Sequence, residues 1–151
     1  MSLLEQLQQD VKAAMKARDQ LKTQTLRMVV AELKKAAIDK RLDELDEASE
    51  IAVVGRAVKQ RREAAAAYDK AEANDRAAAE RAEAELLEGY LPPQASDDEV
   101  AAAVAEIVSE TGASSAKDMG RVMGPLMKRF QGQLDGNRAR QAVQAALSAG
   151  E

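Results

Sequence analysis

The residue types that most often carry chemistry are missing from this sequence. Its 151 residues include no histidine and no cysteine, so the commonest general base and the thiol nucleophile are both absent. The usual zinc ligand sets need the same two residue types. The segment GASSAK (112–117) resembles a phosphate-binding loop, but it lacks a second glycine before its lysine and follows no strand pattern. We therefore predict no catalytic residue, no metal site and no cofactor.

The residues best suited to binding are basic and lie towards the C-terminus. Between residues 112 and 147, six basic residues outnumber two acidic ones, whereas the first 111 residues contain 16 bases and 23 acids. The chain as a whole has a net charge of -4, so this asymmetry favours an anionic partner for the C-terminal part only. The candidate side chains are Lys117, Arg121, Lys128, Arg129, Arg138 and Arg140.

A helix through this basic segment would have two distinct faces. At helical periodicity Lys117, Arg121 and Lys128 fall on one side, and the apolar residues fall on the other. The apolar set is Met119, Val122, Met123, Leu126, Met127 and Phe130. Its methionines are typical of a core that lacks aromatic residues, although a groove for a partner's helix is an alternative.

Two glycines, Gly120 and Gly124, fall beside the basic face of this helix. One interpretation is close packing against a neighbouring helix. The other is that bare backbone lets a phosphate or ribose approach between Lys117 and Arg121. The sequence leaves both open.

A second basic run, KQRR, contains Lys59, Arg61 and Arg62. Acids at Glu63 and Asp69 follow it, which favours a solvent-exposed helix face.

Several helix boundaries are indicated by capping residues. Ser2 with Glu5, Ser96 with Glu99, and Ser115 with Asp118 have the spacing of capping boxes. Further caps are predicted at Asp19, Asn74 and Asp135, and helix ends at Gly89, suited to the left-handed conformation, and at Gly112. Pro125 is expected to kink or end its helix.

The overall pattern predicts an all-α protein. We expect an N-terminal bundle of about four helices over residues 1–90, a linker at 91–95 within YLPPQAS, and a C-terminal three-helix module over 96–151. No run approaches the roughly 18 apolar residues of a membrane span. The absence of cysteine and an N-terminus rich in glutamine and acid predict a cytoplasmic protein.

Five motifs in order resemble the YqeY family, also called the GatB/YqeY domain family. They are RMVVAELK, VGRAVKQRRE, AELLEGYLPPQ, DMGRVMGPLM and LDGNRARQAV, and together they cover nearly the whole chain. The resemblance implies a two-part helical fold. It also implies relatives that help hold tRNA, in the tail of the B subunit of the glutamine-dependent tRNA amidotransferase and in some glutaminyl-tRNA synthetases.

The resemblance makes specific residues candidates for contacts with the tRNA backbone. Lys117, Arg121 and Lys128 are the first choice, Arg138 and Arg140 the second, and Lys59, Arg61 and Arg62 an extension. Stand-alone members are commonly labelled with carbon-nitrogen ligase activity using glutamine as amido donor. That label belongs to the full amidotransferase, whose kinase-like catalytic portion this chain lacks.

Two functions therefore stand side by side. The first is a tRNA-binding accessory module that recognises shape and phosphate, since few aromatic residues are present to stack on bases. The second is a module that docks on an amidotransferase or an aminoacyl-tRNA synthetase through apolar helix faces. Ligase activity of the chain alone is the third and least favoured.

Overall fold

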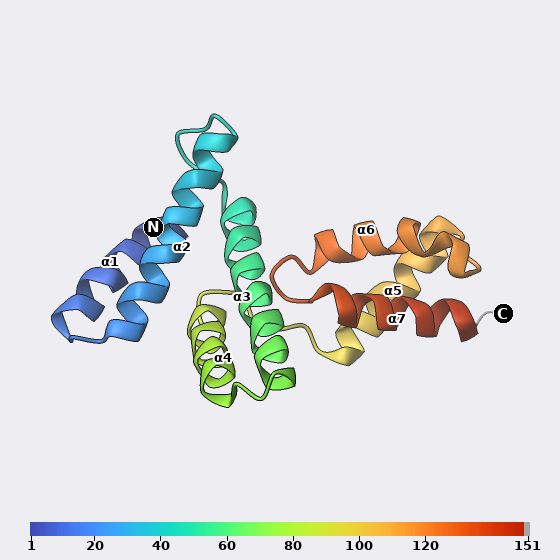
Figure 1. Cartoon of the computed structure of the whole chain (residues 1–151). Helices are drawn as coiled ribbons and strands as arrows, with labels where there is room; N and C mark the ends of the chain where they lie inside the picture. The colour runs from blue at the N-terminus through green and yellow to red at the C-terminus, as the bar shows by residue number, and fades with distance from the viewer. Residues whose placement is uncertain (150–151) are drawn as a thin grey trace. The chain divides into compact units, whose positions relative to one another are not determined.

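The computed structural model describes residues 1–149, and this part of the chain forms seven α-helices, one short 3-10 helix and no strand (Figure 1). The helices are α1 (Leu3–Lys16), α2 (Gln20–Asp39), α3 (Glu47–Lys70), α4 (Asn74–Glu88), α5 (Asp97–Thr111), η1 (Ala116–Asp118), α6 (Met119–Arg129) and α7 (Gly136–Ala149). The prediction of an all-α fold is confirmed. Contacts divide the chain into two compact units, Met1–Leu91 and Pro92 onward.

Most predicted helix starts are confirmed. Ser2 and Glu5 form a reciprocal capping box, as do Ser96 and Glu99. Asp19 accepts a hydrogen bond from the Lys22 amide at 3.0 Å, and Asp135 accepts one from the Arg138 amide at 2.9 Å. The cap predicted at Asn74 is wrong, because Asn74 is the first helical residue and Ala73, which precedes it, offers no side-chain acceptor.

The backbone conformation at the helix ends agrees less well with the prediction made from glycines. Gly112 ends α5 as predicted and is left-handed (φ 69°), whereas Gly89 lacks the left-handed conformation predicted for it (φ -61°). Instead Arg18, Arg41 and Glu72 adopt positive φ after α1, α2 and α3. Each of these turns makes the paired backbone hydrogen bonds of a Schellman motif, such as Arg18 to Met15 and Asp19 to Ala14. These bonds offset the cost of a non-glycine residue in this conformation.

Pro125 does not end its helix, since α6 continues to Arg129. Val122 and Leu126 are fully buried on either side of the proline, and Phe130 is buried after it. Burial of these side chains outweighs the roughly 3 kcal/mol that a proline costs inside a helix.

The first unit pairs α1 with α2 and α3 with α4 around a core of leucine, valine and alanine. Its buried residues are Leu7, Leu26, Val29, Leu33, Val54, Ala57, Val58, Ala84 and Leu87. Two partly buried polar contacts link distant segments. The Glu50 carboxylate accepts hydrogen bonds from the amides of Leu3 (3.3 Å) and Leu4 (2.7 Å), and the Tyr90 hydroxyl donates to Asp10 at 2.5 Å.

One buried polar group in the first unit has no partner. The side-chain oxygen of Thr25 makes no hydrogen bond to any of the described residues 1–149, although the residue is only 1% exposed. Replacing Thr25 with valine keeps the shape and removes the unsatisfied hydroxyl. We therefore expect T25V to raise the free energy of unfolding by about 1 kcal/mol in urea denaturation. T23V is the matched control, because the Thr23 hydroxyl does donate, to the Asp19 carbonyl at 2.7 Å, and its loss should give no gain.

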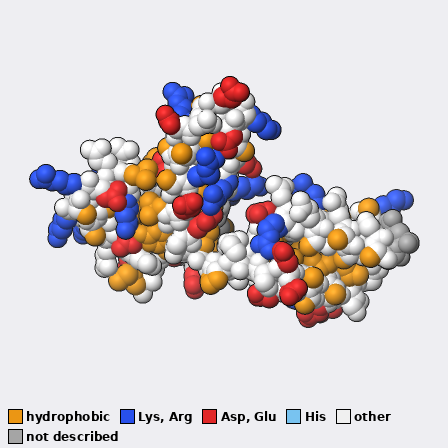
Figure 2. Space-filling model, turned by 90° about the horizontal axis from the view of Figure 1, so that it is seen from below, with side chains coloured by type: hydrophobic (Ala, Val, Ile, Leu, Met, Phe, Trp, Pro, Cys, Tyr) orange, Lys and Arg blue, Asp and Glu red, His pale blue; other side chains and the backbone are white. Residues whose placement is uncertain are grey.

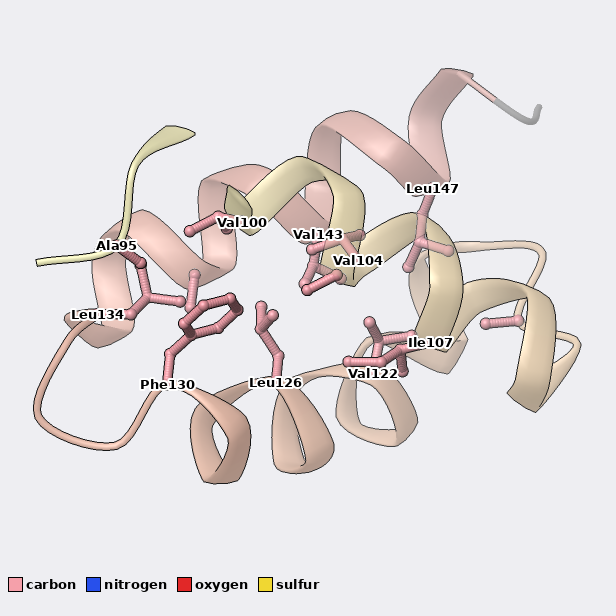
Figure 3. Packing of buried hydrophobic residues seen from close by; sticks show 13 residues of the cluster. Ala95, Val100, Val104, Ile107, Val122, Leu126, Phe130, Leu134, Val143 and Leu147 are labelled. Atoms are coloured by element: carbon pink, nitrogen blue, oxygen red, sulfur yellow. The ribbon is translucent and has the colours of Figure 1, made fainter. Parts of the chain in front are cut away.

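The second unit packs α5, α6 and α7 around its own core (Figure 3). Val104, Ile107, Val122, Leu126 and Val143 fill the centre, and the single phenylalanine, Phe130, lies at one end. Ala95, which the sequence assigned to the linker, is buried in this core, and its amide donates to the Gln133 carbonyl at 2.8 Å. The second unit therefore orders the chain before α5 begins.

Candidate functional site

Helix α6 has the two faces that its sequence predicts. Val122 and Leu126 are buried, and Met119, Met123 and Met127 are half-buried against the same core. The interpretation of the methionines as core residues is supported by this packing. The opposite face of the helix is exposed and contains Arg121, Gly124, Pro125 and Lys128. Their spacings of three and four residues place them along a single face.

The two glycines of α6 are exposed, and packing does not require them. A Cβ atom added to Gly120 or Gly124 would meet nothing within 4 Å apart from the helix itself. Close approach of a neighbouring helix within the second unit is therefore not the reason for their small size. They leave a length of bare backbone next to the basic side chains.

Three arginines of the second unit hold the helices together. Arg121 donates to Asp118 at 3.3 Å and also to the carbonyl of Thr111, the last residue of α5. Arg129 pairs with Glu106 of α5 at 2.9 Å. Arg138 pairs with Asp97 at 2.8 Å and donates to the Ala95 carbonyl at 2.9 Å. Their charge is thus partly engaged within the protein.

Asp118 organises the segment that precedes α6. Its carboxylate accepts hydrogen bonds from the amides of Ser114 (2.9 Å) and Ser115 (3.3 Å), in addition to the Arg121 contact. The Ser114 hydrogen bond in particular, with smaller contributions from Ser115 and Arg121, holds the pKa of Asp118 below its ordinary value. Lys117 is next to this fixed carboxylate, so the backbone that carries Lys117 is well anchored.

The remaining basic residues of the second unit are exposed and make no ion pair within residues 1–149. They are Lys117, Lys128 and Arg140. A cation without a partner can bind an external anion without first breaking an internal contact. Among the six predicted side chains of this unit, these three are the best placed to bind.

The KQRR run of α3 is not the solvent-exposed face that its sequence favours. The Arg61 side chain is only 7% exposed, and it donates to Glu83 of α4 and to the Ala57 carbonyl, both at 3.0 Å. Arg62 pairs with Glu88 at 2.8 Å. Among the three basic residues of the run only Lys59 is well exposed, with a distant contact of 4.0 Å to Glu63. Burial removes Arg61 from the candidate site, since its side chain is enclosed and its Nε and Nη1 groups already donate within the protein.

Sequence reasoning missed another group of basic residues. Lys12 of α1 and Arg27 and Lys34 of α2 line one groove in the first unit. The spacing of seven between Arg27 and Lys34 was a usable signal that they share a face. The addition of Lys12 depends on how the two helices pack, which no local pattern gives.

Other kinds of site find no support in the described residues. No group of three or more acidic residues is close enough to hold a metal ion between residues 1 and 149. In the same part of the chain, no helix has both the length and the apolar character needed to cross a membrane.

The features above define a small all-α protein with two helical units and with exposed cations on α6, on α7 and in the segment before α6. The chain belongs to the YqeY family, because residues 4–147 match the family described as Yqey-like protein. It is similar to the Kluyveromyces lactis protein named "Altered inheritance of mitochondria protein 41, mitochondrial", with 32% identity over 94% of this chain and 78% of the relative. The protein of the same name from Eremothecium gossypii is 33% identical over 97% of this chain and 81% of the relative.

These relatives correct the predicted cytoplasmic location. Their names place them in mitochondria, so the prediction of a cytoplasmic protein is wrong on this comparison. The reason lies in what the two sequence features can distinguish. A lack of cysteine and a polar N-terminal segment argue against a secretory route, but they do not separate one non-secretory compartment from another.

Proposed function

We propose that the second unit binds tRNA through phosphate contacts along α6 and the segment before it. Lys117 and Lys128 are the principal contacts, Arg140 is an additional one, and the exposed backbone at Gly120 and Gly124 lets a phosphate come close. The observation that carries this proposal is a pair of exposed lysines that make no ion pair within residues 1–149 and lie beside glycines that packing does not require. The proposal assigns no chemical step to the chain itself.

The number of phosphate contacts determines how strongly binding should depend on salt concentration. Each neutralised phosphate releases condensed counterions, so affinity falls as a power of the salt concentration. With three such contacts, the slope for duplex nucleic acid gives a loss of roughly 40-fold between about 50 and 200 mM salt. Recognition of shape and phosphate also suits a chain whose aromatic content is 2%.

The test is binding of the full chain to total tRNA at these two salt concentrations, measured by fluorescence anisotropy. We expect K117E/K128E to bind at least about ten-fold more weakly than the natural sequence at low salt and to lose most of the salt dependence. Both residues are exposed and make no ion pair in the part of the chain that the structure describes, so the variant should keep its helical content.

The matched control is R27E/K34E, which makes the same change in net charge in the first unit. Its tRNA affinity should stay within about two-fold of the natural protein at the same salt, since charges beyond the contact are screened. Equal losses in both variants would show a general charge effect and would refute a specific interface on α6. Binding that does not respond to salt would refute phosphate recognition altogether.

Docking on an amidotransferase or an aminoacyl-tRNA synthetase is the second candidate function. It is favoured by large apolar side chains that are exposed in the first unit, among them Met15 (56%), Met28 (54%) and Ile38 (73%). Such a partner is expected to remain bound to the purified protein after nuclease treatment.

A further inference from the structure

A groove between α1 and α2 combines an apolar floor with a basic rim. Its lining residues are Gln8, Val11, Lys12, Arg27, Val30, Ala31 and Lys34, and its volume is about 490 Å³. Val11, Val30 and Ala31 supply the floor, three cations supply the rim, and no acidic residue takes part. We propose that this groove binds an amphipathic helix of a partner protein whose polar face is acidic.

The spacing of the lining residues is suited to a helical ligand. On α2 they follow Arg27 at intervals of three, four and seven residues, which places them on a single face, and on α1 Val11 and Lys12 follow Gln8 at intervals of three and four. Side chains at these intervals form ridges and grooves into which a third helix packs. Arg27 and Lys34 are about 10 Å apart along the helix axis, so two turns of a peptide would span them.

Large apolar side chains extend the floor along both helices. Met15 lies one turn beyond Val11 on α1 and is 56% exposed, and Ile38 lies one turn beyond Lys34 on α2 and is 73% exposed. Val11 and Val30 are only half-buried. Figure 2 shows hydrophobic side chains at the surface of the first unit with Lys and Arg side chains around them. Exposed apolar surface bordered by polar groups is typical of a protein interaction site.

The charges identify the chemistry of the occupant. Lys12, Arg27 and Lys34 make no ion pair within residues 1–149, whereas their neighbour Lys35 pairs with Asp39 at 2.8 Å. Carboxylates on the flanks of a docked helix would meet these cations while its apolar side chains cover the floor. An RNA backbone would satisfy the cations but would leave Val11, Val30 and Ala31 uncovered, so a peptide fits better.

The test uses the full chain and a display library of helical peptides about 14 residues long with randomised positions. We expect enrichment of peptides that have apolar residues at three- and four-residue intervals and acidic residues beside them. R27E/K34E should bind the enriched peptides at least about ten-fold more weakly, whereas K117E/K128E, with the same change in net charge, should stay within about two-fold.

A second variant separates the floor from the rim. V30T replaces a half-buried floor residue by one of similar shape with a hydroxyl, so it should weaken peptide binding and leave tRNA binding unchanged. The proposal is wrong if selection on the natural sequence enriches no peptide that R27E/K34E fails to enrich. It is also wrong if the enriched peptides lack acidic residues.

The same experiments would detect two other occupants of the groove, RNA and a second copy of the chain. Displacement of the peptides by tRNA, together with loss of tRNA binding in R27E/K34E, would assign the groove to RNA and overturn the proposal. A dimer in sedimentation analysis that R27E/K34E dissociates would assign the groove to a second copy of the chain and overturn it equally.

Discussion

Replacing Leu126 by alanine is expected to unfold the second unit while the first unit stays folded. Leu126 is fully buried at the centre of the core that α5, α6 and α7 share (Figure 3). Truncating a buried leucine costs about 2 to 5 kcal/mol, because the lost burial is compounded by a cavity. The second unit contains only about 60 residues, a size at which the total stability is of similar magnitude.

Amide hydrogen exchange followed by mass spectrometry would check this expectation. Peptides from α5, α6 and α7 should lose protection in L126A, and those from α1 to α4 should keep it. The control is K128A on the same helix, whose exposed side chain has no ion pair within residues 1–149 and whose loss should change stability by less than about 0.5 kcal/mol. Equal loss of protection in both units would contradict two separate cores.

Replacing Arg61 by alanine is expected to destabilise the first unit by about 2 to 4 kcal/mol, somewhat less than the roughly 3 to 5 kcal/mol for breaking a fully buried ion pair. The Arg61 side chain is 7% exposed, and its partner Glu83 is 27% exposed. Removing the guanidinium leaves the Glu83 carboxylate partly buried without its cation and takes the additional side-chain donor from the Ala57 carbonyl. Partial access of water to Glu83 keeps the cost below the maximum.

The next residue along the chain is the matched control. Arg62 joins the same two helices through Glu88, but both side chains are about 40% exposed, so R62A should cost only about 0.5 kcal/mol. Urea denaturation followed by circular dichroism would compare the two variants. R61M/E83L should recover most of the lost stability, since apolar residues of similar size often replace a buried pair without loss. Equal costs for R61A and R62A would show that burial of Arg61 is unimportant.

The local elements could be predicted from the sequence because their signals are local. A serine with an acidic residue three positions later fixes a helix start through contacts inside one turn, and Ser2 and Ser96 both do so. The helical periodicity of apolar and basic residues likewise predicted the two faces of α6. The prediction of a left-handed conformation at Gly89 was wrong, because that conformation depends on the turn that follows the helix as well as on the residue.

The candidate site was less predictable, since it depends on which charges are already paired. Sequence alone identified the basic residues of the second unit, but it ranked Arg121 with Lys117 and Lys128 and gave no sign that Arg121, Arg129 and Arg138 are paired within the protein. The packing of α6 and α7 against α5 brings the three arginines to carboxylates and carbonyls, and it leaves the two lysines in solvent.

By itself the sequence determined the all-α class, most of the helix starts and the positive charge of the C-terminal part. Each of these follows from residues close together in the chain, through capping, periodicity and composition. The tertiary structure alone decided that Arg61 is buried, that Glu50 caps α1, and that Lys12 joins Arg27 and Lys34 around an apolar groove. These features arise between residues far apart in sequence, because burial and ion pairing are set by which helix faces meet.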